Sequence, residues 1–476
     1  MVKTKIICTI GPASESYEML KKLYEAGMNI VRLNMSHGNH EWHEKIIKQI
    51  KTLNREVKHT IPILMDTQGP EIRTGSIDND LNIKTGEVIT ITVRGSADVE
   101  YSSLHIEYED LLNDVNVGDK ITVDNGLINL EVLEKHDITM TCKVIDGGVL
   151  KSKRHVNLPG IKVNLPAITE KDKKDIQFAI DNDLDFIALS FVRQAEDIRE
   201  LKKLMGDKVG KIKIIAKIED QEGITNLLEI VKEADGVMVA RGDLGVEINI
   251  EDLPNVQREI IRLCSIHGRR SIVATHMLES MIENPIPTRA EVTDVANAIY
   301  EEADAVMLSA ETTVGKYPVK CVQQLVKIAQ KAEVMSGLMF AKNLIKESDK
   351  QYLVSSAVQL AEELKASGII VITRRGIMAD YVSNCRPFYN KIYAFTNVNK
   401  TRRALMLNRG VTPYMIQMST DPEKTLQNAF QTLRDREGFV SGDKVVVITD
   451  VFAKKGTIDA IQIRYIPEVE DSSSVK

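Results

Sequence analysis

The sequence predicts an α/β protein whose main unit is a closed parallel barrel of eight strands, a (β/α)8 barrel. Three observations support this fold: eight short runs rich in β-branched residues, segments of helical period between them, and run ends that recur about every 30 residues, the length of one β/α unit. The runs occupy residues 5–10, 29–33, 61–65, 186–189, 212–218, 236–240, 271–274 and 305–308.

The segments between the runs have the apolar periodicity of amphipathic helices. The first segment has Ser14 or Ser16 as its N-cap and Gly27 as its stop, and Thr169 with Asp172 forms a capping box ahead of the fourth run. The apolar faces of the first two helices consist of Met19, Leu20, Leu23, Ala26, Trp42, Ile46, Ile50 and Leu53.

One gap between runs is too long for a single β/α unit. Removing about 95 residues between the third and fourth runs restores a normal spacing. These residues alternate apolar and polar side chains with period 2, and the turn signal Asp124-Asn125-Gly126 separates two such stretches. We therefore expect a small β domain at 71–165, inserted into a barrel domain made of residues 1–70 and 166–339.

Strand and helix patterns resume after residue 339. Apolar strands are expected at 369–373, 391–395, 413–417 and 444–449. This pattern predicts an open α/β domain at 340–476.

The composition argues against several functional classes. The chain has 62 Lys and Arg against 68 Asp and Glu, whereas proteins that bind nucleic acids or anionic membranes normally carry a basic excess. Its five cysteines lie far apart without C-x-x-C spacing, which favours a reducing compartment over a disulfide framework or a zinc site. No signal-peptide core or apolar run of membrane-spanning length is present, so we expect a cytoplasmic protein.

Polar residues end six of the eight runs, and the carboxyl ends of barrel strands are where active sites lie. A belt of structural ion pairs is the alternative interpretation, but contributions from six strands at once disfavour it. The residues concerned are Arg32, Asn34, Ser36, Asp66, Thr67, Lys217, Glu219, Arg241, Asp243, Thr275, Ser309 and Glu311.

The fifth and sixth runs end in a pattern suited to a divalent cation. Glu219 and Asp243 come from neighbouring strands, and Lys217 adds a fixed positive charge that would stabilise an oxyanion or enolate. Glycines 242 and 245 lie at a predicted helix start, whose free amides favour a carboxylate or phosphate. With Arg32 as a bidentate phosphate ligand, this pattern predicts a Mg²⁺ site for a small phosphorylated anion.

A series of motifs occurs in order at residues 4–12, 31–38, 66–75, 156–160, 214–219, 238–247, 277–281, 287–291 and 294–298. In these motifs the sequence resembles the pyruvate kinase family over essentially its whole length. The resemblance implies phosphoryl transfer from phosphoenolpyruvate to ADP, giving pyruvate and ATP. It also implies a homotetramer in which the inserted domain is a mobile β-barrel lid.

The resemblance also assigns roles at the barrel mouth. Mg²⁺ or Mn²⁺ would bind Glu219 and Asp243, and the amides of Gly242 and Asp243 would receive the substrate carboxylate. Lys217 and Arg32 would stabilise the transferring phosphoryl group. Thr275 would relay a proton through water to the enolate carbon, within a network that includes Ser309 and Glu311.

A monovalent-cation site and nucleotide contacts follow from the same resemblance. Glu71 supports K⁺ dependence, because relatives that do not need K⁺ have a lysine at this position. The expected K⁺ ligands are Asn34, Ser36, Asp66 and Thr67. The expected nucleotide contacts are Asn34, His37, Arg73 and Arg154, and closure of the lid would exclude water.

Four positions depart from the family pattern. Gln68 replaces a lysine common in K⁺-dependent members, which leaves the strength of that dependence open. His276 replaces a glutamine, and either packing or a catalytic role is open to it. Asp220 replaces an asparagine, and His155 replaces a glycine beside Arg154.

The C-terminal domain resembles the family's allosteric domain. Family members activated by a sugar bisphosphate have a Thr-x-x-Gly-(Lys/Arg)-Ser loop, whereas residues 373–378 here read Thr-Arg-Arg-Gly-Ile-Met. A phosphorylated effector of unknown identity is expected, although a solvated basic surface is the alternative. The candidate effector ligands are Thr373, Arg374, Arg375, Lys400 and Arg402.

Two other functions remain as rivals. A Mg²⁺-dependent aldolase or lyase would use the same carboxylates, but it needs neither a nucleotide lid nor a K⁺ site. A sensor that keeps the fold without catalysis would be expected to lack one of Lys217, Glu219, Asp243 or Thr275, and all four are present.

Overall fold

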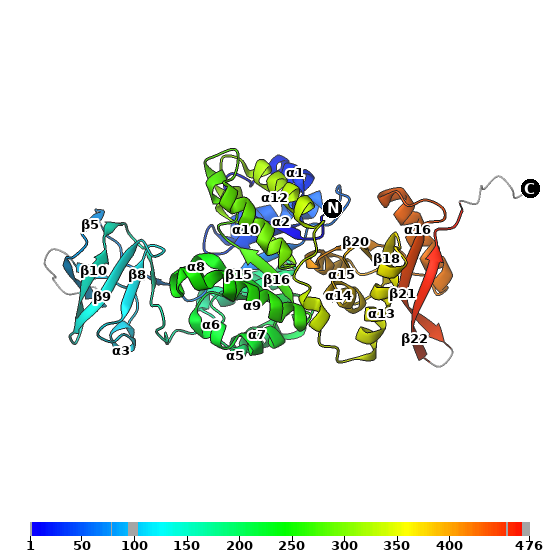
Figure 1. Cartoon of the computed structure of the whole chain (residues 1–476). Helices are drawn as coiled ribbons and strands as arrows, with labels where there is room; N and C mark the ends of the chain where they lie inside the picture. Colours follow the sequence, from blue (N-terminus) through cyan, green and yellow to red (C-terminus); the bar gives the residue numbers. More distant parts are fainter. Residues whose placement is uncertain (1, 78, 94–102, 454–455, 469–476) are drawn as a thin grey trace, which may run out of the picture.

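The computed structural model describes residues 2–77, 79–93, 103–453 and 456–468. Parts of the predicted insert and of the predicted C-terminal domain therefore lie outside the described residues. The elements form three groups along the long axis of the molecule, with the inserted β elements at one end, the barrel in the middle and a second sheet at the other end (Figure 1).

Eight parallel strands close the central barrel, which confirms the predicted fold class. Their order around the barrel is β1, β17, β16, β15, β14, β13, β3 and β2. Their bounds are β1 Lys5–Thr9, β2 Ile30–Asn34, β3 Ile63–Asp66, β13 Phe186–Leu189, β14 Lys213–Ile218, β15 Gly236–Ala240, β16 Arg270–Ala274 and β17 Ala305–Leu308.

Helices cover the outside of the barrel. The main ones are α1 Tyr17–Ala26, α2 His40–Leu53, α4 Glu170–Asp181, α5 Ala195–Met205, α7 Leu227–Glu233, α9 Leu253–Ile266, α10 Arg289–Tyr300 and α12 Pro318–Ala332. Shorter helices are α6 Gln221–Thr225, α8 Arg241–Glu247 and α11 Ala310–Thr313. Ser16, not Ser14, caps α1 by accepting from the amide of Met19, and the capping box of Thr169 and Asp172 is confirmed.

The interior of the barrel is packed with apolar side chains. Ile7, Leu64, Phe186 and Met238 belong to this cluster, and Leu407 of the C-terminal region joins it. The polar residues lie at the carboxyl ends of the strands, where the active sites of such barrels are found.

The insert forms its own small barrel. Its main sheet has the order β4, β12, β8, β9, β10, β6, β7, and a bridge between Thr74 and Ile106 joins its two ends. The predicted turn connects β8 to β9, with positive φ at Asp124, Asn125 and Gly126. The elements are β4 Ile72–Arg73, β5 Leu81–Ile83, β6 Val88–Thr92, β7 Ser103–His105, α3 Leu111–Asp114, β8 Lys120–Val123, β9 Ile128–Lys135, β10 Thr139–Asp146, β11 Gly148–Leu150 and β12 His155–Asn157.

The C-terminal region is a five-stranded sheet with helices packed against it. Its order is β20, β19, β18, β21, β22, and only the edge strand β22 runs antiparallel to its neighbour. Four of these strands lie near the predicted positions, whereas β22 was not predicted. The elements are α13 Asp349–Glu363, β18 Gly368–Ile372, α14 Ile377–Asn384, β19 Ile392–Thr396, α15 Asn399–Ala404, β20 Val411–Met415, α16 Pro422–Glu437, β21 Lys444–Ala453 and β22 Gly456–Tyr465.

In the described part of the chain, five short 3₁₀ helices lie at Gly206–Lys208, Ile250–Asp252, Glu279–Ile282, Phe340–Asn343 and Leu405–Leu407. Within the described residues, none of the helices is both long and apolar enough to cross a membrane.

Candidate active site

Lys217 stands at the centre of a cluster of charged side chains at the barrel mouth. Its Nζ lies 3.0 Å from Oδ1 of Asp66 and 3.0 Å from Oε1 of Glu219, and it donates to Oγ of Ser190 at 2.7 Å. Burial alone would lower the pKa of Lys217, but the two carboxylates outweigh burial and raise it. Lys217 is therefore a fixed cation, not a proton donor, near neutral pH.

Asp66 fixes a second cation beside Lys217. The side chain is fully buried, and its Oδ2 accepts from Nε of Arg32 at 2.7 Å. Burial opposes ionisation of Asp66, yet Lys217 and Arg32 hold its pKa below the ordinary value. Nη1 of Arg32 donates to Oγ1 of Thr9 at 3.0 Å, and its Nη2 makes no hydrogen bond to the described residues. Arg32 thus has one nitrogen left for a ligand.

Glu219 and Asp243 form an acidic pair in contact with each other. Burial, together with the neighbouring carboxylates Asp243 and Asp66, raises the pKa of Glu219 to about 7. Burial also raises the pKa of Asp243, and Glu219 is close enough to hydrogen-bond its carboxyl group. The amide of Phe191 donates to Oε2 of Glu219 at 2.6 Å and holds that side chain in place. Two neighbouring carboxyls, of which Glu219 is fully buried and Asp243 is partly exposed, offer the oxygen ligands that a hard divalent cation prefers.

Thr275 has a backbone conformation that is unfavourable for a β-branched residue. Its φ is 63°, in the left-handed region, and such residues cost about 1–3 kcal/mol unless neighbours hold them. Arg241 does so: its Nη2 donates to the Thr275 carbonyl at 2.7 Å, and its Nη1 is bound by Asp294 at 2.7 Å. Arg241, which we expected among the polar residues of the site, is thus used to position Thr275.

The Thr275 hydroxyl faces the first turn of helix α8, which directly follows β15. Its Oγ1 accepts from the amide of Gly242 at 2.9 Å and donates to the Ala274 carbonyl at 2.7 Å. The structure therefore brings together Thr275 and one of the two amides predicted to bind the substrate carboxylate. A ligand at this amide has to displace the Thr275 hydroxyl or share the amide with it.

The two residues predicted after β17 differ in what their side chains do: Glu311 holds backbone in place and Ser309 does not. Glu311 is buried, and its carboxylate accepts from the amides of Ser309 at 2.7 Å and Leu278 at 3.0 Å. Oγ of Ser309 is buried without a hydrogen-bond partner among the described residues. The hydroxyl of Ser309 is therefore available to a ligand or a water molecule, whereas Glu311 is not.

The predicted K⁺ ligands lie next to one another because β2 and β3 pair at Asn34 and Asp66. Oδ1 of Asn34 accepts from the amide of Ser36 at 3.2 Å, and Oγ1 of Thr67 accepts from the amide of Ser190 at 3.0 Å. The carboxylate of Asp66 is already bound by Arg32 and Lys217, so a cation here would share its oxygens.

The predicted nucleotide residues are divided between the barrel and the insert. Arg73 donates to Glu71 and, at 2.9 Å, to the Lys153 carbonyl. Nη1 of Arg154 is 3.5 Å from Oδ1 of Asp124. His37 is exposed after β2, on the barrel beside Asn34. These residues are held by separate neighbours and do not form one cluster.

The substituted positions have local explanations. Asp220 caps α6 by accepting from the amide of Gly223 at 2.7 Å, and burial raises its pKa to about 6. Nδ1 of His155, in the insert, is 3.7 Å from Oδ1 of Asp243. His276 is largely exposed, and its Nε2 lies 3.8 Å from Glu279. Nε2 of Gln68 donates to Glu71 at 3.3 Å.

Sequence reasoning missed Ser190, Phe191 and Thr9, which orient Lys217, Glu219 and Arg32 respectively. Thr9 and Ser190 lie at the ends of predicted runs, so their position could have identified both as candidate site residues. The contribution of Phe191 comes from its backbone amide, for which the residue type carries no signal.

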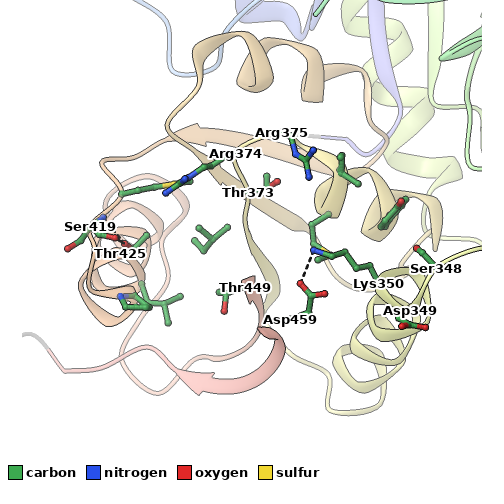
Figure 2. Close-up of a pocket in the computed structure, with 17 residues that line it drawn as sticks. Ser348, Asp349, Lys350, Thr373, Arg374, Arg375, Ser419, Thr425, Thr449 and Asp459 are labelled. Carbon is green, nitrogen blue, oxygen red and sulfur yellow. Dashed lines mark hydrogen bonds and ion pairs between the residues drawn. The ribbon is translucent and has the colours of Figure 1, made fainter. Parts of the chain in front are cut away.

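The C-terminal region contains a separate cavity of about 630 Å³, shown in Figure 2. Three of the predicted effector residues line it, namely Thr373, Arg374 and Arg375. Nζ of Lys350 and Oδ1 of Asp459 are 2.9 Å apart at the same cavity. Other polar side chains lining the cavity are Ser348, Asp349, Ser419, Thr425 and Thr449.

The other two predicted effector residues do not line this cavity. Nζ of Lys400 is 3.1 Å from Oδ1 of Asp183, at the base of the barrel. Lys400 shares a neighbouring cavity of about 600 Å³ with Arg374 and Arg375. Arg402 lines a third cavity, which shares no lining residue with the other two.

Comparisons with known proteins agree with this geometry. A family model described as pyruvate kinase, barrel domain, matches residues 1–322, and one described as pyruvate kinase, alpha/beta domain, matches residues 351–464. Plastidial pyruvate kinase 2 of Arabidopsis thaliana is 42% identical over 473 residues, which are 98% of this chain and 81% of the relative. A pyruvate kinase of Staphylococcus epidermidis is 41% identical with the same coverage.

A solved structure shows the same arrangement of the chain. The crystal structure of a pyruvate kinase from Cryptosporidium parvum superposes with a TM-score of 0.91 at 35% sequence identity, covering 98% of this chain and 96% of that one. The barrel, the charged cluster at its mouth, both family models and these relatives lead to one conclusion: the chain belongs to the pyruvate kinase family.

Proposed function

We propose that this chain transfers the phosphoryl group of phosphoenolpyruvate to ADP, giving pyruvate and ATP. The observation that carries the proposal is the buried cation Lys217, held between Asp66 and Glu219 and beside the acidic pair of Glu219 and Asp243. Such a site holds a fixed cation, and beside it the ligands for a second one, where a phosphoryl group and an enolate develop negative charge.

The acidic pair is the proposed site for Mg²⁺ or Mn²⁺. Both carboxyls have raised pKa values, chiefly because desolvation disfavours their charged forms, and a divalent cation would offset the repulsion between them. Within the described residues, no group of three His, Cys, Asp or Glu residues forms a complete metal cage. The remaining ligands would be substrate oxygens and water, and the ion would supply charge neutralisation of those oxygens when bound.

The transfer step depends on fixed charges of the chain itself. The bond from phosphorus to the enol oxygen breaks, and an oxygen of the terminal phosphate of ADP bonds to phosphorus. Lys217 and Nη2 of Arg32 would contact the phosphoryl oxygens, while the amides of Gly242 and Asp243 would hold the substrate carboxylate. This mechanism consists of positioning and charge stabilisation.

Protonation of the enolate at carbon completes the reaction. Thr275 is a poor acid by itself, so we assign to it the orientation of a water molecule that donates the proton. Arg241 keeps the Thr275 hydroxyl at the first turn of α8, where the substrate carboxylate would bind. The unpartnered hydroxyl of Ser309 is a second candidate ligand for that water.

Activation by K⁺ and closure of the lid are part of the proposal. Asn34, Ser36, Asp66 and Thr67 lie together and offer oxygen atoms. Arg73 and Arg154 of the insert would contact the nucleotide phosphates, with Asn34 and His37 on the barrel side. Lid closure would exclude water and limit hydrolysis of the transferred group.

We further propose that the cavity of Figure 2 binds a phosphorylated effector through Thr373, Arg374 and Arg375. A homotetramer in the cytoplasm is the remaining part of the proposal. Support for a reducing compartment comes from the cysteines, all five of which are free.

A coupled assay tests the catalytic proposal. ATP and pyruvate should appear together from phosphoenolpyruvate and ADP, and chelation of divalent cations should abolish the reaction. Cleavage of a 2-oxo acid without ATP formation would instead show an aldolase or lyase, and absence of any turnover with Mg²⁺ and K⁺ would favour a sensor. Independently of turnover, Mg²⁺ should raise the melting temperature of the metal-free protein but not that of the Glu219→Gln variant.

A further inference from the structure

A cavity of about 420 Å³ lies between the base of the barrel and the C-terminal sheet. It is distant from the proposed reaction because its walls come from the end of α2, the loops that precede β3 and β13, and helix α15. It shares no lining residue with the cavity of Figure 2. We call it the interdomain cavity, and its lining consists of Lys51, Asn54, Arg55, Thr60, Ile61, Ile63, Asp183, Leu184, Asp185, Asn399, Arg402, Arg403 and Met415.

Positive charge exceeds negative charge in this lining. Four cations face two acids, and both acids are already neutralised. Arg403 binds Asp183 at 2.6 Å and Asp185 at 2.7 Å, and Lys400, which is outside the lining, binds the same two carboxylates at 3.1 and 3.5 Å. The two acids therefore have no charge left for the other cations.

Arg402 is the most unusual of the remaining cations. Its Nε is buried without a hydrogen-bond partner in the described protein, although buried donors are almost always paired. Burial lowers the pKa of Arg402, and the nearby cations Arg403 and Arg436 lower it further, with no acid acting in the opposite direction. The side chain remains charged, because arginine stays protonated in proteins. The positive charge of Arg402 is thus repelled by the positive charges of its neighbours.

Two more cations of the lining come from the barrel side. Lys51, in the last turn of α2, donates from Nζ to the Asn182 carbonyl at 2.9 Å. Arg55 follows the same helix, and its side chain is exposed at the cavity. Neither residue forms a salt bridge in the part of the chain that the structure describes. Three cations from two domains thus line one cavity, and none of the three forms a salt bridge with a described carboxylate.

We propose that the interdomain cavity is a binding site for a small phosphate-bearing anion, held by Arg402 from the C-terminal domain and by Lys51 and Arg55 from the barrel. A phosphate group fits this set because a guanidinium presents parallel donors to two phosphate oxygens, and a dianion offsets cations that now repel one another. A cavity of this volume admits a phosphate monoester, since small-ligand sites measure about 300–1,000 Å³.

Binding at this place would join the two domains. The anion would contact α2 of the barrel and α15 of the C-terminal domain at once, so its free energy of binding would add to that of the domain interface. This inference does not depend on the proposed catalytic function, because none of its residues lies at the barrel mouth.

Isothermal titration calorimetry on the full chain tests the site. The measurement uses Mg²⁺-free buffer and a Lys217→Met, Arg374→Gln background, in which anion binding at the barrel mouth and at the cavity of Figure 2 is weakened. The probes are inorganic phosphate, pyrophosphate and glycerol 3-phosphate, which separate recognition of the free ion from recognition of an ester. We expect one site in the background protein at millimolar or lower probe concentration.

Added substitutions then locate the binding. Arg402→Gln and Lys51→Gln should each weaken binding about tenfold, the loss expected for one charged contact. Lys48→Gln is the matched control, because Lys48 lies on the same helix, is exposed, pairs with Glu44 and does not line the cavity. It should leave the dissociation constant unchanged.

Three outcomes would overturn the proposal: no binding to the background protein, unchanged binding in Arg402→Gln, or equal losses in Arg402→Gln and Lys48→Gln. Circular dichroism on each variant separates loss of the site from loss of the fold. A crystal soaked in tungstate provides a second test, because the anomalous signal should lie between Arg402 and Lys51. A signal only at the barrel mouth or in the cavity of Figure 2 would also contradict the inference.

Discussion

The barrel mouth and the interdomain cavity both collect cations, but they neutralise them differently. At the mouth, Lys217 and Arg32 are bound by carboxylates within 3.0 Å, so these cations are stable without a ligand. In the interdomain cavity, the two carboxylates are bound by Arg403 and Lys400, and the charges that shift the pKa of Arg402 are those of other cations. Paired charges form a preorganised site whose geometry exists before the ligand arrives. Unpaired charges gain most of their stabilisation from the ligand itself.

The largest expected effect comes from removing the central cation of the mouth. Lys217→Met should lower kcat by several orders of magnitude, because the developing negative charge then lacks its nearest fixed cation. The coupled assay measures this loss, with circular dichroism as a check on folding. Lys213→Met is the matched control, since Lys213 begins the same strand and pairs with Asp235 at the opposite end of the barrel. Near-normal turnover in Lys217→Met would refute the assigned role.

A smaller but still large effect is expected from Asp66→Asn. This variant keeps the shape of the side chain and removes the charge that binds both Lys217 and Arg32. We expect a loss of about 10²-fold in kcat and about 3 kcal/mol in the free energy of unfolding, because buried cations lose their partner. Steady-state kinetics and urea unfolding measure the two quantities. If both equal those of Asp235→Asn, the carboxylate of Asp66 does not organise the site.

A stability effect is expected at Glu247, where the end of helix α8 meets the insert. Oε1 of Glu247 accepts from Nδ2 of Asn157 at 2.9 Å, and burial raises the pKa of Glu247 to about 7. A raised carboxyl pKa means that the folded state binds a proton more tightly than the unfolded state. Stability from this group is therefore complete below about pH 4.5 and is lost as the pH rises toward about 7, by at most about 3 kcal/mol.

Melting temperatures between pH 5 and pH 7.5 test this pH dependence. Glu247→Gln should flatten the profile relative to the unmodified chain, whereas Glu251→Gln, which changes an exposed side chain of the next 3₁₀ helix, should not. Parallel profiles for the two variants would show that folding does not raise the pKa of Glu247.

The smallest expected effect is a gain in stability, and it distinguishes the interdomain cavity from the barrel mouth most directly. In phosphate-free buffer, Arg402→Gln should raise the free energy of unfolding by about 0.5 kcal/mol, because it removes repulsion and no salt bridge. Urea unfolding measures the change, and added phosphate should reverse it. A destabilised variant in phosphate-free buffer would mean that Arg402 has a stabilising partner, contrary to the comparison.

The barrel was predictable because its strands are buried on both faces and therefore appear as continuous apolar runs. Their polar ends predicted Lys217, Glu219 and Asp243 correctly as neighbours, since parallel strands bring their carboxyl ends to the same rim. The family resemblance supplied the roles of these residues, which position alone does not give.

Other features depended on contacts that sequence does not show. Arg402 was grouped with Arg374 by charge, but α15 directs it to the barrel side of its domain. The left-handed backbone of Thr275 depends on Arg241, which in turn is held by Asp294 from helix α10. The edge strand β22 was not predicted, because Ala460 and Ile461 interrupt its alternation of apolar and polar residues.

The side chain of Leu407 completes the floor of the barrel, and Lys5 of the first strand donates to the carbonyl of Val411 at 2.6 Å. During synthesis, the contacts of the first strand therefore remain incomplete until residues some four hundred positions later have been made. A ribosome-bound chain truncated after the eighth strand should accordingly hold an unfinished cylinder, sensitive to proteases, until the last domain emerges.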